Sequence, residues 1–193
     1  MTIAILGTGN MGRGLAKRLD GKANVVVGSR SEGPDYAEAV KAADIVVLAM
    51  PYAAALEQAK TLDLAGKVVV DMSNPITPDF AALTIGHTTS AAEEIAKAAP
   101  GAKVVKAFNT IFASLFDQPV TETEKVPVFV AGNDETAVEK VADLAHKAGF
   151  AVEKVGGLDG ARLVEPVGML NIRLGYGLGQ GTSIAPKWVK LAA

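Results

Sequence analysis

The chain has 193 residues with 19 basic and 21 acidic side chains, and its formal net charge of -2 provides no broad positive field for nucleic-acid binding. Hydrophobic residues make up 49% and charged residues 21%, proportions that exclude disordered and collagen-like chains. The absence of cysteine excludes disulfides and thiolate metal sites. The longest uncharged apolar run, residues 45–56, is too short for a membrane span, and the first strand begins too early to leave room for a signal peptide. We therefore expect a cytoplasmic protein.

Short aliphatic runs alternate with segments of helical composition along the chain. Strands that are covered on both faces are almost wholly apolar, so these runs predict a sheet buried between two helical layers. The predicted strands are residues 3–6, 25–27, 45–49, 68–70, 104–105 and 128–130, and the predicted helices are residues 11–19, 36–43, 53–60, 90–98, 135–148 and about 161–174. This alternation predicts an α/β fold with a Rossmann-like, doubly wound parallel sheet and right-handed crossovers.

Two regions depart from the alternation. Residues 71–89 are too long and too polar for an ordinary connection, so we expect them to form a loop that lines a site. From residue 156 onward, several glycines surround a single helical stretch. We expect residues 1–155 to form a dinucleotide-binding domain and residues 156–193 to form a small C-terminal helical lobe packed on it.

A glycine-rich turn follows the first predicted strand and opens the first predicted helix. Its sequence is Gly7-Thr8-Gly9-Asn10-Met11-Gly12, the G-x-G-x-x-G pattern. The first glycine permits a tight turn, the second lets the backbone approach a pyrophosphate, and the third lets helix and strand pack closely. Unpaired amides at the helix N-terminus would then face the phosphates. The alternative is a glycine-rich turn without a ligand, but the position of the motif at the head of a β-α pattern favours the dinucleotide.

The end of the second predicted strand indicates which dinucleotide binds. An acidic residue there usually accepts hydrogen bonds from the ribose of NAD, whereas this strand ends in Gly28-Ser29-Arg30. A serine hydroxyl and a guanidinium can both donate to a 2′-phosphate, which a carboxylate would repel. These residues favour NADP, although Glu32 could instead reach the ribose of NAD.

Other candidate binding residues follow the carboxyl ends of later strands, where ligands of doubly wound sheets bind. Apolar and amide side chains there suit flat rings and a carboxamide or ribose. The candidates are Met50, Pro51 and Tyr52 after the third strand, Asn74 after the fourth, and Ala107, Phe108, Asn109 and Thr110 after the fifth. For Met50 and Phe108, an ordinary role in the core is an equally good interpretation.

The sequence offers no convincing acid-base group and no metal site. His146 lies within a predicted helix and His87 in the polar loop, and neither has partners at a ligand spacing. Hydride exchange between a nicotinamide and a flavin-like ring demands less, because the acceptor ring delocalises charge and its proton can come from water. We therefore assign no catalytic side chain and expect a small-molecule redox acceptor.

With these motifs the chain resembles the coenzyme F420-dependent NADP oxidoreductase family, and also the NADPH-binding domain of the six-transmembrane ferric reductases. The resemblance runs nearly end to end. It depends on the glycine turn, 28–30, 49–51, 73–74, 90–93, 105–110 and 161–165. It implies that Thr8, Asn10 and Met11 hold the pyrophosphate, that Ser29 and Arg30 hold the 2′-phosphate, and that the segments 50–51 and 107–110 hold the nicotinamide half. It also implies a homodimer.

The segment 106–110 departs from the archaeal deazaflavin enzymes, which tend to carry histidine near Asn109, and is more like the metalloreductases, which use an ordinary flavin. The sequence therefore leaves F420, FMN, FAD, a quinone and an imine as candidate acceptors, with F420 or a flavin the leading expectation. One alternative function is a noncatalytic NADP sensor whose cleft is filled, for example by Tyr52 and Phe112. Another is a small imine or β-hydroxyacid dehydrogenase, although such enzymes usually add a much larger helical domain than the residues remaining here.

Overall fold

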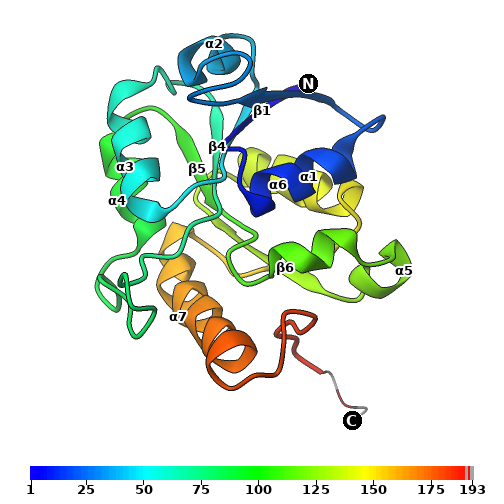
Figure 1. The fold of residues 1–193 in the computed structure, drawn as a ribbon. Helices are drawn as coiled ribbons and strands as arrows, with labels where there is room; N and C mark the ends of the chain where they lie inside the picture. Colours follow the sequence, from blue (N-terminus) through cyan, green and yellow to red (C-terminus); the bar gives the residue numbers. More distant parts are fainter. Residues whose placement is uncertain (190, 192–193) are drawn as a thin grey trace.

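A computed structural model describes residues 1–189 and 191, and these residues form an α/β fold around a seven-stranded sheet in the order β2-β1-β3-β4-β5-β6-β7 (Figure 1). The strands are β1 (Thr2–Leu6), β2 (Asn24–Gly28), β3 (Ile45–Leu48), β4 (Val68–Asp71), β5 (Lys103–Lys106), β6 (Pro127–Gly132) and β7 (Ala151–Lys154). Strands β2 and β3 lie on opposite sides of β1 in the sheet. The glycine turn after β1 therefore lies at the topological switch point, where such folds bind ligands.

The sheet is mostly parallel, which confirms the predicted Rossmann-like class. The expectation of a wholly parallel sheet is wrong at β6, which pairs antiparallel with β5, whereas β7 pairs parallel with β6. In place of one long crossover helix, the connection from β5 to β6 contains a 3-10 helix, η1 (Ala113–Asp117), and the short α5 (Val120–Thr123). Strand β7 escaped prediction because half of its residues are charged and exposed at the sheet edge.

Helices cover both faces of the sheet. The side chains of α1 (Asn10–Leu19) and α6 (Glu135–Lys147) pack with Ile3 and Ile5 in one core cluster. Those of α2 (Tyr36–Lys41), α3 (Tyr52–Thr61) and α4 (Ala91–Ala98) pack with Leu6 in the other. Figure 1 shows the two layers on either side of the sheet. The apolar residues of α6, which recur every three or four positions, are buried on one face of the helix.

The chain after β7 forms η2 (Leu158–Gly160), α7 (Ala161–Ile172) and a terminal π-type turn, η3 (Arg173–Gly177). The start of α7 lies against α4, and the helix then runs away from the sheet (Figure 1). Gly168 of α7 meets the residues that follow β4 and β5, which brings this helix to the ligand-binding edge of the sheet. Within the described residues, no helix is long and apolar enough to cross a membrane.

Candidate cofactor-binding cleft

The glycine turn has the geometry that its sequence predicts. Gly7 adopts a φ of +123°, and a Cβ there would lie 2.3 Å from the carbonyl oxygen of Ala49. A Cβ on Gly12 would lie 2.2 Å from the carbonyl oxygen of Gly7. A side chain at Gly7 would keep the turn away from the residue that follows β3. A side chain at Gly12 would keep α1 away from the turn, so both positions require glycine.

Gly9 plays a different part, because it faces open space. It is exposed, and no atom would lie within 4 Å of a Cβ built on it. It is also the N-cap of α1, where no side chain caps the helix. The first amides of a helix have no partners within the helix and carry its positive dipole end. The turn therefore presents an uncapped, accessible helix N-terminus that fits a diphosphate.

Ser29 and Arg30 follow directly after β2, beside this turn. The amide of Gly7 donates to the carbonyl oxygen of Gly28 at 3.1 Å, which ties the two loops together. The Ser29 hydroxyl oxygen accepts from the amides of Ser31 at 3.0 Å and Glu32 at 2.7 Å, so its proton remains available for donation. Arg30 is exposed and forms no ion pair with another described residue. This arrangement fits an exposed phosphate beside the ribose.

A cleft of about 370 Å³ starts at the turn and runs across the ends of β3, β4 and β5. Nine of the residues predicted to bind cofactor line it, namely Gly9, Asn10, Met11, Met50, Pro51, Asn74, Phe108, Asn109 and Thr110. The other lining residues are Ala49, Met72, Ile111, Phe112, Ala113, Gly168, Asn171, Ile172 and Tyr176. The cleft therefore has one polar wall of amides and a larger apolar wall.

Some predicted residues lie away from the cleft. Gly7, Thr8 and Gly12 lie in the glycine turn and Ser29 and Arg30 directly after β2, and these five are not among the residues that line the cleft. Ala107 is fully buried behind it. Tyr52 begins α3 outside the cleft lining, where burial raises the pKa of its hydroxyl and the carboxylates Glu94, Glu165 and Asp71 add to the effect.

Phe108 is among the residues that line the cleft, and its ring packs in the core. Its side chain is fully buried, in edge contact with the ring of Phe150 at a centroid distance of 6.5 Å. The residue adopts a φ of +65°, a conformation that bulky residues rarely take and that concentrates at functional sites. Of the two interpretations that the sequence left open for Phe108, its burial agrees with the role in the core.

Two asparagines form the polar wall. The amide nitrogen of Asn74 donates to the carbonyl oxygen of Asn109 at 2.8 Å, and that of Asn109 donates to Oδ1 of Asn74 at 2.9 Å. Asn109 also donates to the carbonyl oxygen of Val164 in α7 at 3.0 Å. Gly168 lets α7 approach, because a Cβ there would lie 2.8 Å from the carbonyl oxygen of Asn109. The pair thus joins the ends of β4 and β5 to α7.

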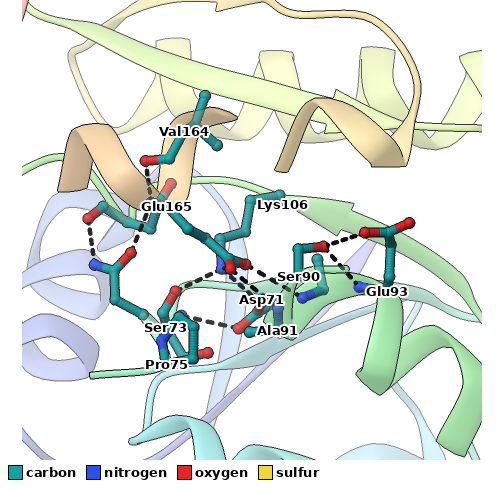
Figure 2. Close-up of polar contacts among 12 residues, drawn as sticks. Asp71, Ser73, Pro75, Ser90, Ala91, Glu93, Lys106, Val164 and Glu165 are labelled. Carbon is teal, nitrogen blue, oxygen red and sulfur yellow. Dashed lines mark hydrogen bonds and ion pairs between the residues drawn. The ribbon is translucent and has the colours of Figure 1, made fainter. Parts of the chain in front are cut away.

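Behind this wall lies a buried charge cluster formed by Asp71, Lys106 and Glu165 (Figure 2). Lys106 Nζ lies 2.8 Å from Asp71 Oδ2, 2.8 Å from Glu165 Oε1 and 2.5 Å from the carbonyl oxygen of Ser73. Glu165 Oε2 also accepts from the amide of Ala91, the first residue of α4, at 3.0 Å. Burial raises the pKa of Glu165, while Lys106 opposes the shift. All three side chains are at most 1% exposed.

The sequence interpretation missed this cluster, although a signal was present. Asp71 and Lys106 are the last residues of two neighbouring parallel strands and are paired in register. Because Asp71 and Lys106 end two apolar runs and carry opposite charges, an ion pair between them could have been predicted once β4 and β5 were known to be neighbours. The lining contributed by α7 had no comparable signal, because it depends on how that helix packs on loops far away in sequence.

The two histidines lie apart from the cleft. His87 is exposed in the loop 71–89, and His146 Nδ1 lies 3.1 Å from the carbonyl oxygen of Phe150. No group of three or more His, Asp or Glu among residues 1–189 and 191 could hold a metal ion. The glycine turn, the switch point and the cleft together define a dinucleotide-binding protein of the Rossmann type.

Comparisons with known proteins identify the family. The family model described as NADP oxidoreductase coenzyme F420-dependent matches residues 2–34 and 32–75. The F420-dependent NADP reductase of Methanocaldococcus jannaschii is 31% identical over 209 residues, which cover 90% of this chain and 92% of that protein. The chain therefore belongs to the F420-dependent NADP oxidoreductase family, and it is an NADP-dependent oxidoreductase.

Two further relatives agree with this assignment. Metalloreductase STEAP3 of Rattus norvegicus is 33% identical over 181 residues, which cover 86% of this chain but only 36% of that protein. A crystal structure of a putative F420-dependent NADP reductase from Arthrobacter sp. FB24 has a TM-score of 0.84 and 32% identity, and the match covers 98% of this chain and all of that one. An imine reductase from Aspergillus terreus, with a TM-score of 0.66 and 16% identity, shares the fold alone.

Proposed function

We propose that this protein transfers a hydride between NADP(H) and the deazaflavin F420. The observation that carries the proposal is the continuity of the cleft, which leads from the uncapped helix N-terminus at Gly9 to the half-buried Asn74 and the buried Asn109. A dinucleotide whose diphosphate lies at the turn would extend its nicotinamide half into this cleft. Arg30 and Ser29 would hold the 2′-phosphate.

The chain's contribution would be positioning and exclusion of water. When NADPH and F420 are both bound, the reduced nicotinamide would supply a hydride to the deazaflavin, which would take a proton from water. NADP⁺ and the reduced deazaflavin would then leave. Met50, Ile172 and Phe112 give the cleft an apolar wall that suits flat rings. Such a site must hold the reacting atoms about 3–3.5 Å apart. No acid or base side chain is assigned a step.

Two features support a deazaflavin as the acceptor. The match to the archaeal F420-dependent NADP reductase covers nearly the full length of both proteins, whereas the match to the metalloreductase covers about a third of that protein. The cleft also keeps a volume of about 370 Å³ for a flat acceptor: of the two residues that would fill it in a noncatalytic sensor, Phe112 lines it and Tyr52 does not. FMN and FAD are the competing acceptors because the segment 106–110 resembles the metalloreductase version.

A panel of acceptors tests the proposal. Purified protein is mixed with NADPH and, in separate reactions, F420, FMN or FAD, and the absorbance of both partners is followed. We expect loss of deazaflavin absorbance at a rate at least ten times that with either flavin. Faster reduction of FMN or FAD would replace the proposed acceptor, and oxidation of NADPH by none of the three would contradict the proposed reaction.

We also propose that the protein is a homodimer. Leu163 and Leu170 lie about two turns apart on α7 and are 71% and 55% exposed, which is unusual for large apolar residues on one helix. A second copy would cover them. Light scattering should give twice the chain mass for the native protein, and the mass of a single chain would contradict the dimer.

A further inference from the structure

The charge cluster of Asp71, Lys106 and Glu165 lies behind the cleft wall, and none of its three residues is among those that line the cleft. Buried ion pairs contribute little net stability, because desolvation offsets their attraction. Three charged groups with a single positive charge among them are a costly way to hold a core together. The contacts that the cluster makes with the backbone indicate what it does.

The cluster fixes the loop that carries Asn74. Lys106 Nζ donates to the carbonyl oxygen of Ser73, and Asp71 Oδ1 accepts from the amide of Ser73 at 2.8 Å. Both peptide groups of Ser73 are therefore held by the ion pair (Figure 2). Because Asn74 is the next residue, the pair sets where the polar wall of the cleft begins.

The same cluster fixes α7. Glu165 lies in the second turn of this helix and binds Lys106 on the sheet and the amide of Ala91 on α4. The preceding residue, Val164, accepts the hydrogen bond from Asn109. Further along α7, Asn171 donates to the carbonyl oxygen of Thr110 at 3.1 Å. Both walls at this end of the cleft therefore depend on one buried lysine.

We propose that Glu165 and Lys106 are positioning residues for the nicotinamide end of the cleft, which they set by fixing α7 and Asn74 to the ends of β4 and β5. This inference rests on the proposed function, since it assumes that a nicotinamide enters the cleft. The glycine turn lies at the other end, and none of the hydrogen bonds and ion pairs of the cluster reaches its residues. Loss of the cluster should therefore weaken binding of the ring half and leave binding of the phosphate half unchanged.

The test uses Glu165→Met, which removes the anchor of α7 and leaves Lys106 paired with Asp71. Calorimetry measures the affinity of the full-length variant for NADPH and for 2′-phospho-ADP-ribose, which lacks the nicotinamide. We expect the NADPH affinity to fall about five- to tenfold, the equivalent of one or two hydrogen bonds. The affinity for 2′-phospho-ADP-ribose should stay within about twofold of the native value, since the turn is intact.

Arg162→Met is the matched control, because Arg162 joins the same two helices through Glu93 at the partly exposed surface. We expect it to leave both affinities near the native values. If both ligands weaken equally in Glu165→Met, if neither weakens, or if Arg162→Met has the same effect, the positioning role is contradicted.

A second variant covers a failure of Glu165→Met to fold. Glu165→Gln keeps the shape of the side chain and can still accept from Lys106, but its amide nitrogen faces the amide of Ala91. It should give the same selective loss with a smaller amplitude, and an unchanged ratio of the two affinities contradicts the inference. Native protein that binds neither ligand would instead contradict the proposed function.

Discussion

The two ends of the cleft are built in different ways. The proposed phosphate end consists of the contiguous turn 7–12 and the pair 29–30, exposes Gly9, Asn10 and Arg30, and is shaped by backbone geometry. The ring end brings together Asn74, Asn109 and α7 through buried side-chain contacts across long stretches of sequence. A short motif can specify the first end by itself, whereas the second exists only after the sheet and the last helix have packed. Variants at the two ends should therefore fail in different ways.

The largest effect should come from Lys106→Met at the ring end. This change leaves the carboxylates of Asp71 and Glu165 buried without their cation. Breaking a buried ion pair in this way costs about 3–5 kcal/mol in the free energy of unfolding. Urea unfolding measures the loss. Lys17→Met, which breaks the exposed pair with Asp117, is the control and should change little. A small loss in both variants would mean that the cluster is not a critical part of the fold.

The next effect should come from Arg30→Ala at the phosphate end, where binding and not folding is expected to change. Loss of a charged donor to the 2′-phosphate should weaken NADP⁺ binding by about 1.5–3 kcal/mol, roughly 10- to 150-fold, and leave NAD⁺ binding unchanged. Calorimetry with the two nucleotides checks this. Lys41→Ala, another exposed basic residue, is the control. Equal weakening of both nucleotides would refute the assignment of the 2′-phosphate to Arg30.

Two of the three glycines of the turn, Gly7 and Gly9, separate folding from binding within the proposed phosphate end. Gly9→Ala places a methyl group in open space, so the free energy of unfolding should change by less than about 1 kcal/mol while the NADP⁺ affinity falls at least about tenfold. Gly7→Ala forces a contact with Ala49 at positive φ and should destabilise the fold itself. Thermal unfolding and calorimetry on both variants distinguish these outcomes. Unchanged affinity in Gly9→Ala would show that the phosphates do not approach that residue.

The smallest effect should be the pH dependence of the Glu93–Arg162 pair. The hydrogen bond that Arg162 donates to Glu93 lowers the pKa of the Glu93 carboxyl below its ordinary value of 4.5. A carboxyl group whose pKa is lowered by folding stabilises the folded protein at pH values above its ordinary pKa. This stability is lost as the pH falls through the pKa of the folded state. Native protein should therefore lose slightly more stability on acidification from neutral pH than Arg162→Met, as measured by urea unfolding. An identical loss in both would show that the pair does not influence folding.

Sequence patterns anticipated what depends on neighbours along the chain. The six predicted strands, the main helices, the glycine turn and the Gly28-Ser29-Arg30 segment follow from local composition and from the steric needs of glycine. The antiparallel direction of β6 was missed because an apolar run predicts a buried strand but does not indicate which way the strand runs in the sheet. The sequence could not decide between the core and the cleft for the ring of Phe108, because a left-handed residue other than glycine has no sequence signature.

The ring end could be predicted only in part, for a physical reason. Asn74 and Asn109 were found because they follow strand ends, but their partner Val164 lies 55 residues beyond Asn109. The wall formed by α7 depends on Gly168 fitting against these two asparagines. Such contacts form only in the packed structure, and no residue spacing along the chain predicts them.

A crystal structure of the protein with NADP⁺ would test the central claim most directly. We predict the diphosphate at the amides that open α1, the 2′-phosphate within hydrogen-bond distance of Arg30 and Ser29, and the nicotinamide in the cleft beside Asn74. A 2′-phosphate remote from Arg30, or a nicotinamide outside the cleft, would contradict the account.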